Sequence, residues 1–433
     1  MAEPLNISLI GGGTVGGGVA QILLQHPERI ATRAGRPVHI KRVVVRDPNK
    51  PRPAIPKELI STDIAVAIRD SQIHVVVELM GGTGLAKQVV LDSLAAGKHV
   101  VTANKALLAK HGPEIFEAAR KHERSVGFEA SVAGGIPIIR ALAESLAANQ
   151  ITAIQGILNG TSNFILTAMA DRGVSYSDAL AEAQRLGYAE ADPTLDVDGS
   201  DAAHKLAILV QIAFGVTVPV NEIERFGIAG LHAMDLRFAH ELGYTIKLLA
   251  EAWLDGKEVA LHVAPVLLRR TDMLAQVRGA FNAVQVVGDA VGEVMFQGAG
   301  AGALPTASSV VADIIDLAVG RAQRTFQAMK LWAPHERGFR QRPSEGVRSR
   351  FFLRVLVQDK SGMLADVARV LADQGISIAS VIQHEAVEEH QGDVVPLVIM
   401  THYAETGRFR AAVAKINSLT GVVPPGVFYS VDD

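Results

Sequence analysis

A glycine-rich segment near the start of the chain restricts its fold more than any other feature. An apolar run at 5–10 (LNISLI) leads directly into Gly11-Gly12-Gly13-Thr14-Val15-Gly16, and a segment with helical spacing follows. The pattern Gly11-x-Gly13-x-x-Gly16 between a strand and a helix suits a turn whose backbone amides, including those of Thr14 and Val15, hold a pyrophosphate. A tight strand-to-helix turn without a ligand is the alternative.

The next segments continue the alternation of strands and helices. Helical segments near 85–96 and 113–123 separate further apolar strands, which we place at 38–47, 74–82 and 99–108. Strands that alternate with helices predict an α/β fold with a Rossmann-type, doubly wound parallel sheet. We assign it to residues 1–140, as an NAD(P)-binding domain.

The rest of the chain divides into two further domains. Residues 141–330 predict an α+β domain for substrate binding, catalysis and dimerisation. Its last helix, about 305–320, is expected to pack either within this domain or against the first domain. Residues 331–348 are rich in Arg, Pro and Gly and predict a linker. Residues 349–433 predict a small βαβ-type domain.

Composition excludes several classes of function. The 433 residues carry a net charge of −3, so no basic excess favours nucleic acid. The chain has no cysteine, which excludes disulfides and thiolate metal sites. No apolar run reaches roughly 18 residues, and the first residues lack a basic leader, so we expect no membrane contact and a cytoplasmic protein.

The end of the second expected strand bears on the choice of cofactor. Asp47 suits a ribose 2′-hydroxyl, whereas Arg46, Lys50 and Arg52 suit a 2′-phosphate. Three cations against one carboxylate predict a preference for NADP(H), with NAD(H) possible. These side chains would equally suit a solvated loop.

An acidic loop at 187–199 runs into a helix that we expect to begin with Ser200 as its N-cap. Helical spacing places Asp201 and Lys205 on one face. A lysine beside a carboxylate at the mouth of an acidic loop is able to move a proton next to a substrate that carries an ammonium group. An ordinary ion pair under a solvated loop is the alternative.

Five motifs, taken in order along residues 5–320, resemble the homoserine dehydrogenase family. They are GGGTVGGG at 11–18, TANKALLAKHG at 102–112, NGTSNFIL at 159–166, GYAEADPTLDVDGSDAAHK at 187–205 and GAGAGALPTASSVVADI at 298–314. The resemblance implies NAD(P)-dependent interconversion of L-aspartate 4-semialdehyde and L-homoserine, towards threonine, methionine and isoleucine. Because no aspartate-kinase portion precedes residue 1, it implies the monofunctional form.

The resemblance also implies roles for single residues. Lys205 matches the proton donor of the family, and Lys105 matches a lysine near nicotinamide and substrate. Further matches fall on positions that contact substrate or cofactor: Glu190, Asp196, Asp201, Asn159 and Thr161 for substrate, and Gly187 and Gly302 for cofactor. For Asn159 and Thr161 a turn and a helix cap are the alternative.

Residues 128–140 resemble the loop of the family that surrounds a monovalent cation. The resemblance implies a structural Na⁺ held by Glu129 and by the backbone carbonyls of Val132, Gly134 and Ile136. A glycine-bent turn between a strand and a helix would show the same residues.

The C-terminal segment resembles an ACT domain, with Asp359 and Gly362 in the turn between its first strand and helix. The resemblance implies L-threonine as an effector and a homodimer or homotetramer; a unit that only dimerises the chain is the alternative. Two other functions stay open, another NADP oxidoreductase for an amino-acid-derived aldehyde and a ligand sensor with a vestigial nucleotide fold. Lys105 and Lys205 beside an acidic loop favour an enzyme.

Overall fold

The structure is a computed structural model that describes residues 3–333, 338–383 and 394–432. The chain forms two compact units, and it passes between them several times. The first unit comprises Met1–Gly160, Asp201–Ile223 and Ala280–Phe339, and the second comprises Thr161–Ser200, Glu224–Gly279 and Arg340–Asp433. The domain boundaries expected from the sequence stay predictions.

A six-stranded parallel sheet forms the centre of the first unit, in the order β3-β2-β1-β4-β5-β6. Its strands are β1 (Leu5–Ile10), β2 (Val38–Val44), β3 (Ile60–Ser61), β4 (Val75–Glu78), β5 (His99–Thr102) and β6 (Val126–Gly127). Strands β1 and β4 are buried along their whole length, as in a sheet covered on both faces. The strand order reverses between β1 and β4, where sheets of this kind bind ligands.

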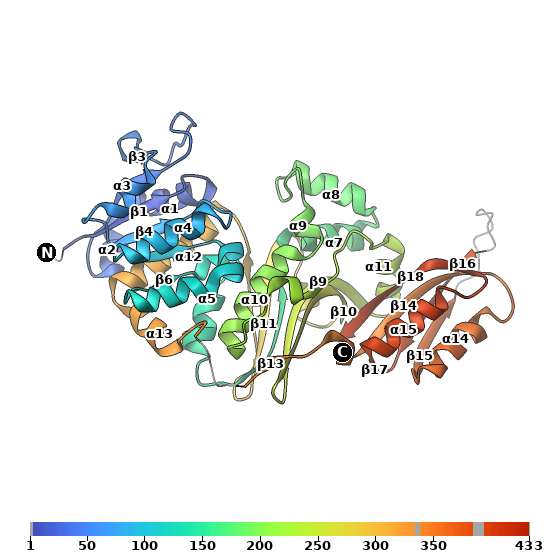
Figure 1. Cartoon of the computed structure of the whole chain (residues 1–433). Coiled ribbons are helices and arrows are strands. Elements are labelled where there is room, and N and C mark those ends of the chain that lie inside the picture. The colour runs from blue at the N-terminus through green and yellow to red at the C-terminus, as the bar shows by residue number, and fades with distance from the viewer. Residues whose placement is uncertain (1–2, 334–337, 384–393, 433) are drawn as a thin grey trace. The chain divides into compact units, whose positions relative to one another are not determined.

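Helices pack on both faces of this sheet (Figure 1). They are α1 (Thr14–Gln25), α2 (Pro27–Ala34), α3 (Ile64–Arg69), α4 (Leu85–Ala95), α5 (Lys105–Lys121), α12 (Ala303–Ala318) and α13 (Arg321–Met329). Helix α12 comes late in the chain, yet Val310 and Ile314 join the same core as Val19 and Leu23 of α1. A Cβ at Gly18 would lie 2.6 Å from the carbonyl oxygen of Ala303, so this glycine lets the two helices approach closely.

The strand expected at 99–108 is wrong over its second half. Strand β5 ends at Thr102, and α5 begins at Lys105. The side chain of Asn104 accepts a hydrogen bond from the amide of Leu107 at 3.1 Å, which caps the helix. Apolar residues that follow a cap continue a helix as readily as a strand, so hydrophobicity alone placed this boundary too late.

The first unit also contains an antiparallel set of three strands. Strand β11 (Phe281–Gly288) pairs with β7 (Ile151–Ile157) and with β12 (Gly292–Ala299). Helix α10 (Ser200–Phe214) supplies the unit with Asp201 and Lys205. The turn into α10 differs from the expected N-cap at Ser200, because the carboxylate of Asp198 accepts both the amide (2.7 Å) and the hydroxyl (2.8 Å) of Ser200.

A long hairpin forms the centre of the second unit. Strands β9 (Tyr244–Asp255) and β10 (Glu258–Arg269) pair along twelve residues each. Three strands from distant segments pair in parallel with the other edge of β10: β8 (Glu224–Arg225), β13 (Arg340–Gln341) and β18 (Val422–Asp432). Strand β13 falls inside the expected linker, where 334–337 lie outside the described residues. The helices of this part are α7 (Gly160–Arg172), α8 (Tyr176–Arg185), α9 (Thr194–Val197) and α11 (Ala233–Glu241).

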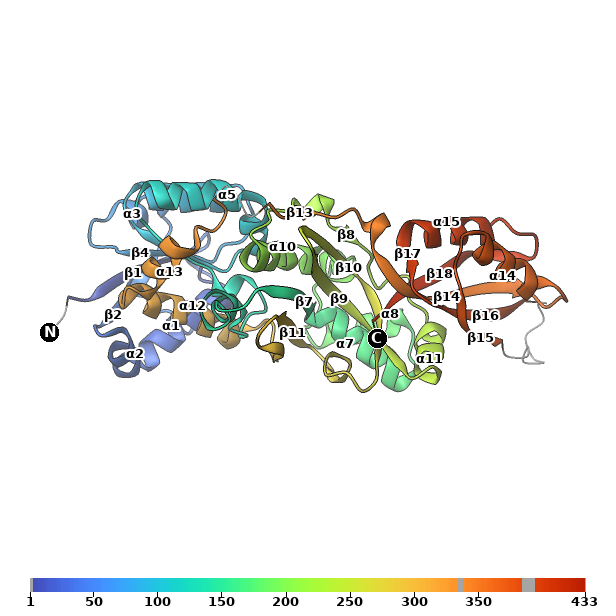
Figure 2. The same ribbon diagram turned by 90° about the horizontal axis from the view of Figure 1, so that it is seen from below.

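The C-terminal part of the second unit folds as β-α-β-β-α-β. Its antiparallel sheet has the order β18-β14-β16-β15. Figure 2 shows α14 and α15 together on one side of it, and Val367 and Phe409 from these helices share a core with Leu353 and Leu397. The elements are β14 (Arg348–Gln358), α14 (Met363–Asp373), β15 (Ile378–Gln383), β16 (Val394–Thr401), β17 (Ala404–Glu405), α15 (Thr406–Ile416) and β18.

A buried ion pair connects this sheet to α11. The guanidinium of Arg354 on β14 binds both carboxylate oxygens of Asp235, and the hydroxyl of Tyr429 on β18 donates to Asp235 at 3.2 Å. The backbone amide of His232 donates to the same carboxylate at 3.0 Å. Asp235 is fully buried, so the carboxylate depends on these partners in place of water.

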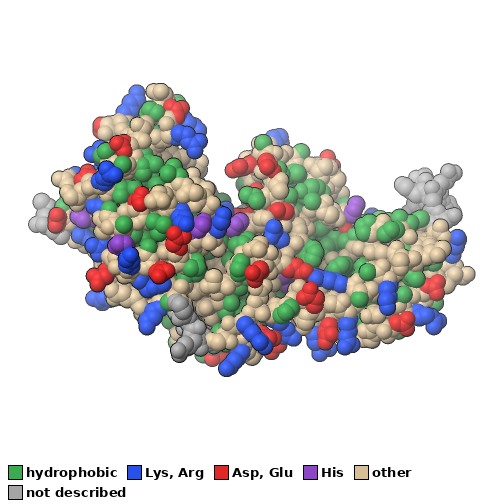
Figure 3. Space-filling view, viewed as in Figure 1, with side chains coloured by type: hydrophobic (Ala, Val, Ile, Leu, Met, Phe, Trp, Pro, Cys, Tyr) green, Lys and Arg blue, Asp and Glu red, His purple; other side chains and the backbone are tan. Residues whose placement is uncertain are grey.

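The surface carries charges of both signs. On the face shown in Figure 3, Lys and Arg side chains are interspersed with Asp and Glu. Among the described residues no single helix is long and apolar enough to cross a membrane. The bent pair α12 and α13 meets the length and composition together, but α12 packs in the core of the first unit.

Candidate active site

The glycine turn follows β1 at the point where the strand order reverses. Gly11 has φ +119°, and a Cβ there would lie 2.6 Å from the carbonyl oxygen of Leu79. A Cβ at Gly16 would lie 2.1 Å from the carbonyl oxygen of Gly11, whereas one at Gly13 would meet no atom within 4 Å. Helix α1 begins directly after Gly13, at Thr14, so its first backbone amides have no partner within the helix. They and the unobstructed Gly13 form a cradle that suits a pyrophosphate.

The loop after β2 contacts the glycine turn through one arginine. Nε of Arg52 donates to the carbonyl of Gly12 at 3.0 Å, and its Nη1 donates to the carbonyls of Asp47 and Lys50 at 2.8 Å each. Arg46 is exposed beside this loop. Arg52 therefore braces the loop, whereas Arg46 and Lys50 are both exposed.

A buried carboxylate holds two lysines in the first unit. The side chain of Asp201, 6% exposed, lies 2.8 Å from Nζ of Lys205 through Oδ2 and 2.6 Å from Nζ of Lys105 through Oδ1. Nδ2 of Asn159 donates to the same Oδ2 at 2.9 Å. Four residues that the sequence analysis placed at the site, from three distant segments, thus meet at one carboxylate.

The two lysines differ in environment. The side chain of Lys205 is 9% exposed, and it also donates to the carbonyl of Leu158 at 2.6 Å. Nδ2 of Asn282 donates to the same carbonyl at 3.0 Å. The side chain of Lys105 is 42% exposed. Lys205 is therefore fixed at the base of the cluster, and Lys105 lies at its surface.

The charge state of Asp201 follows from these neighbours. Burial by itself would raise the pKa of Asp201, but the ammonium groups of Lys205 and Lys105 outweigh it and hold that pKa well below its usual value. The carboxylate therefore stays ionised across the neutral range. It keeps both amines in place as hydrogen-bond donors.

Three expected substrate residues belong to the second unit. Thr161 donates to the carbonyl of Tyr188 at 2.6 Å, and Ser162 donates to the carbonyl of Asp196 at 2.7 Å, so both hydroxyls support the acidic loop. Glu190 is exposed. The contact of Thr161 joins residues 27 positions apart, unlike the turn or helix cap of its alternative, and substrate binding by Thr161, Glu190 and Asp196 stays a prediction.

Two expected cofactor glycines have left-handed backbones. Gly187 has φ +78° and follows the end of α8, and Gly302 has φ +125° and precedes α12. Gly187 lies in the second unit and Gly302 in the first. A turn requirement explains each glycine, so their contact with a cofactor stays a prediction.

The expected cation loop supplies oxygen atoms only. Both carboxylate oxygens of Glu129 accept backbone amides, from Ile139 and Arg140 at 2.9 Å each. Burial raises the pKa of Glu129 to about 7, with Arg140 acting against it. Among the described residues no cluster of three His, Asp or Glu side chains suits a metal ion, so a cation here would depend on backbone carbonyls. The carbonyl of Gly134 already accepts from Ser309 at 2.7 Å.

The expected effector residues lie in the turn between β14 and α14. Gly362 has φ +100°, and a Cβ there would meet no atom within 4 Å. Asp359 is exposed. The turn thus presents backbone and one carboxylate to solvent.

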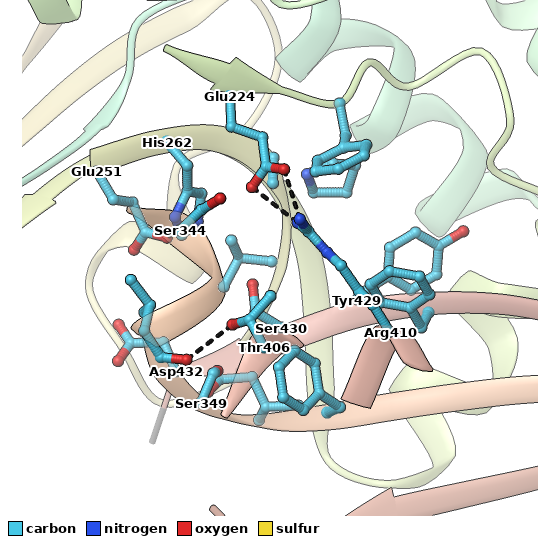
Figure 4. A pocket seen from close by; sticks show the side chains of 18 of the residues that line it. Glu224, Glu251, His262, Ser344, Ser349, Thr406, Arg410, Tyr429, Ser430 and Asp432 are labelled. Carbon is cyan, nitrogen blue, oxygen red and sulfur yellow. Dashed lines mark hydrogen bonds and ion pairs between the residues drawn. The ribbon is translucent and has the colours of Figure 1, made fainter. Parts of the chain in front are cut away.

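A cavity of about 680 Å³ lies elsewhere in the second unit, among β8, β9, β10, β14 and β18 (Figure 4). Arg410 donates to both oxygens of Glu224, at 2.6 and 2.7 Å, and packs against Phe226. His262 lies 3.2 Å from the carboxylate of Glu251. None of the site residues expected from the sequence lines this cavity.

An enzyme that moves a hydride to or from a carbonyl carbon must hold a nicotinamide nucleotide near a group that transfers a proton. The first unit offers a cradle of the dinucleotide-binding type and a buried lysine pair. These features define the class of nicotinamide-dependent oxidoreductases.

Comparison with known proteins narrows the class. The family model of homoserine dehydrogenase matches residues 137–315, that of the homoserine dehydrogenase NAD-binding domain matches 11–129, and that of the ACT domain matches 351–420. Homoserine dehydrogenase of Neisseria gonorrhoeae is 44% identical over 98% of this chain and 97% of its own, and that of Pseudomonas aeruginosa is 44% identical over 99% of each. The crystal structure of a homoserine dehydrogenase from Thiobacillus denitrificans has a TM-score of 0.93 and 43% identity, and it covers 100% of this chain and 99% of its own.

The chain belongs to the homoserine dehydrogenase family. It is an oxidoreductase that acts on a CH–OH group, with a nicotinamide cofactor and a C-terminal ACT domain. The family resemblance of the sequence is thereby confirmed.

Several contacts of the site were not foreseen. No sequence pattern indicated the carbonyl of Leu158, the brace formed by Arg52, or the buried contact of Glu78 with Thr102. The start of α5 could have been read from the sequence, because Asn104 follows an apolar run and asparagine is a favoured N-cap. The other contacts join distant segments, and no local pattern announces them.

Proposed function

We propose that Lys205 gives a proton to the oxygen of L-aspartate 4-semialdehyde as the aldehyde is reduced, and takes it back when L-homoserine is oxidised. The observation that carries the proposal is the burial of Lys205 against Asp201 and the carbonyl of Leu158. Such contacts hold the amine in one orientation, as proton transfer requires. Steady-state assays of Lys205 variants test the proposal.

The other residues of the cluster have supporting roles. A bound nicotinamide supplies or accepts the hydride, and the open side of Gly13 fits its pyrophosphate. Negative charge that develops on the substrate oxygen is stabilised by ammonium groups, of which Lys105 is the more accessible. Asp201 holds the ammonium groups of both lysines in place. Glu190 and Asp196 bind the ammonium group of the substrate.

NADP(H) is the preferred cofactor in this proposal. Arg46 is exposed after β2, in a loop that Arg52 braces against the glycine turn. A hyperthermophilic archaeal homoserine dehydrogenase, 28% identical over 72% of this chain with a TM-score of 0.61, was solved in complex with NADPH. A cation at this position suits a 2′-phosphate, and NAD(H) remains usable.

Arg46→Ala is expected to weaken NADPH binding roughly ten- to a hundredfold and to leave NADH binding within about twofold, because only NADPH offers a phosphate for a charge-assisted hydrogen bond. Fluorescence titration of both cofactors measures the two dissociation constants. Arg69→Ala removes another exposed arginine of the same unit and serves as the control. Equal losses for NADPH and NADH would show that Arg46 does not read the phosphate.

We also propose a structural Na⁺ at Glu129 and the carbonyls of Val132, Gly134 and Ile136. The donor set is all oxygen, as hard cations prefer, and the side chain of Glu129 is buried, where a cation would compensate its negative charge. The ion would fix the turn that precedes α6 (Ile138–Arg140). No step of the reaction depends on it.

Feedback control by L-threonine completes the proposal. The ACT domain is present, and its first turn presents Asp359 and the backbone of Gly362 to solvent. A carboxylate and free backbone groups are complementary to the ammonium and carboxylate of an amino acid. The expected homodimer or homotetramer belongs to the proposal as well, with residues 141–330 as its dimerisation domain.

Asp359→Ala is expected to abolish inhibition by threonine and to leave kcat without threonine unchanged, because the variant removes the partner of the effector's ammonium group. Aldehyde reduction over a threonine titration measures this. Asp373→Ala removes an exposed carboxylate of the same domain as a control. Point variants are preferred to truncation, since deletion would take Arg354 from the buried Asp235. If Asp359→Ala stays inhibited while Arg410→Met does not, the cavity of Figure 4 is the effector site.

A further inference from the structure

We infer that Glu78 is a positioning residue for Lys105, and that it acts through Thr102 and Asn104. The inference rests on the proposed role of Lys105 in the reaction. Glu78 is fully buried, so it does not touch substrate. It is the last residue of β4, and it pairs with Ile10, which immediately precedes the glycine turn.

The carboxylate of Glu78 joins two loops at the carboxyl edge of the sheet. Its Oε1 accepts the backbone amides of Met80 and Gly81, at 2.8 and 3.3 Å. Its Oε2 accepts the hydroxyl of Thr102 at 2.6 Å. Glu78 and Thr102 stand opposite each other on the parallel strands β4 and β5, which places both side chains on one face of the sheet.

Thr102 also bonds to Asn104, the residue that caps α5. Its hydroxyl oxygen accepts the amide of Asn104 at 3.1 Å. Asn104 then caps α5 through the amide of Leu107 and donates through Nδ2 to the carbonyl of Gly82 at 2.7 Å. Lys105 follows as the first residue of the helix. A continuous chain of hydrogen bonds thus connects Glu78 to the backbone that carries Lys105.

The chemistry of Glu78 suits this task. The three donors on Glu78 are all neutral, so the carboxylate serves as an acceptor for all of them at once. An apolar residue would leave these buried donors without a partner. The ammonium group of Lys105 lies 2.6 Å from Asp201, so the position of the backbone at the start of α5 sets the distance that this side chain has to span. A displacement of about 1 Å at a reacting group lowers the rate of the reaction by up to about a hundredfold.

The test is a double-mutant cycle between Thr102→Val and Lys105→Met. Valine has the shape of threonine without its hydroxyl, so the variant breaks the chain of hydrogen bonds at its middle. We expect Thr102→Val alone to lower kcat for aldehyde reduction roughly ten- to a hundredfold, with the dissociation constant of NADPH within about twofold. In the Lys105→Met background the same substitution lowers kcat less than about twofold further, because the group that it displaces is gone.

Thr102→Ser keeps the hydroxyl and is expected to restore kcat to within about threefold of the unsubstituted enzyme. Ser93→Ala is the matched control, because Ser93 is a buried hydroxyl of the same sheet domain that donates only to the carbonyl of Val89 on its own helix. It should shift the melting temperature without changing kcat. Glu78→Gln keeps one oxygen for the amides of Met80 and Gly81 but replaces the acceptor of the Thr102 hydroxyl by an NH2 group, which cannot accept it. This variant replaces Thr102→Val in the cycle if the valine variant does not fold.

Equal losses from Thr102→Val in both backgrounds would overturn the inference, since the hydroxyl would then act on the fold in general. If Lys105→Met alone leaves kcat unchanged, the proposed role of Lys105 is wrong, and the inference is overturned together with it. The two failures are therefore distinguishable by the single Lys105 variant.

Discussion

Lys205→Ala lowers kcat for aldehyde reduction by about a hundredfold or more in our prediction, with NADPH binding nearly intact. The loss of a positioned proton donor has this scale, and the partners of Lys205, Asp201 and the carbonyl of Leu158, are outside the glycine turn at 11–16. Absorbance of NADPH at saturating substrate measures kcat, and titration of NADPH measures its binding.

Two further variants separate proton transfer from charge and from burial. Lys205→Arg keeps a cation but hardly releases a proton, so it should be nearly as slow as the alanine variant. Lys98→Ala removes another buried lysine of the first unit, one that donates to the carbonyl of Asp70, and should leave kcat near normal. Normal turnover by Lys205→Ala would exclude Lys205 from proton transfer.

The pH dependence gives a second measure of the same role. Asp201 stays ionised across the assay range because its pKa lies well below the usual value. The amine must be neutral to accept a proton in homoserine oxidation and charged to give one in aldehyde reduction. The oxidation rate should therefore rise with pH more steeply than the reduction rate. Parallel profiles would contradict a lysine acid and base.

Asp235→Ala is expected to lower the free energy of unfolding by about 3–5 kcal/mol. The variant leaves the buried guanidinium of Arg354 without its carboxylate, and a single buried charge is costly. It also takes a partner from the hydroxyl of Tyr429. Denaturation in urea, followed by circular dichroism, measures the change.

Glu258→Ala is the control for Asp235→Ala. Glu258 pairs with Arg340, whose side chain is 77% exposed, so its loss should cost less than about 1 kcal/mol. The double variant Asp235→Ala with Arg354→Met removes both charges and should recover much of the lost stability. A loss as small as that of Glu258→Ala would mean that water compensates Arg354.

Strand and turn patterns of the first unit could be read from the sequence because their causes are local. The apolar run at 5–10 coincides with β1, and the glycine spacing after it matches backbone that a side chain would obstruct. Asp201 and Lys205 are four residues apart on a helix, so their pairing required no knowledge of the fold. The limit of β5 was misplaced because the side chain of Asn104, and not hydrophobicity, ends the strand.

Contacts between distant segments could not be read in this way. Lys105 reaches Asp201 from another helix, and Arg354 reaches Asp235 across more than a hundred residues. Strand β10 pairs along one edge with three separate segments, one of which lies in the expected linker. Burial and a defined partner, which decide whether a charged side chain is functional or merely solvated, exist only once these segments meet.

The sequence by itself determined the dinucleotide turn, the α/β class, the helical pairing of Asp201 with Lys205 and, through its motifs, the family. Each depends on residues that are neighbours along the chain or on motifs of local backbone geometry. Only the tertiary structure decided that Asp201 holds a second lysine, and that Glu78 binds Thr102 beside the start of the helix that carries Lys105. Those facts depend on distances of about 3 Å between atoms that only the folded chain brings together.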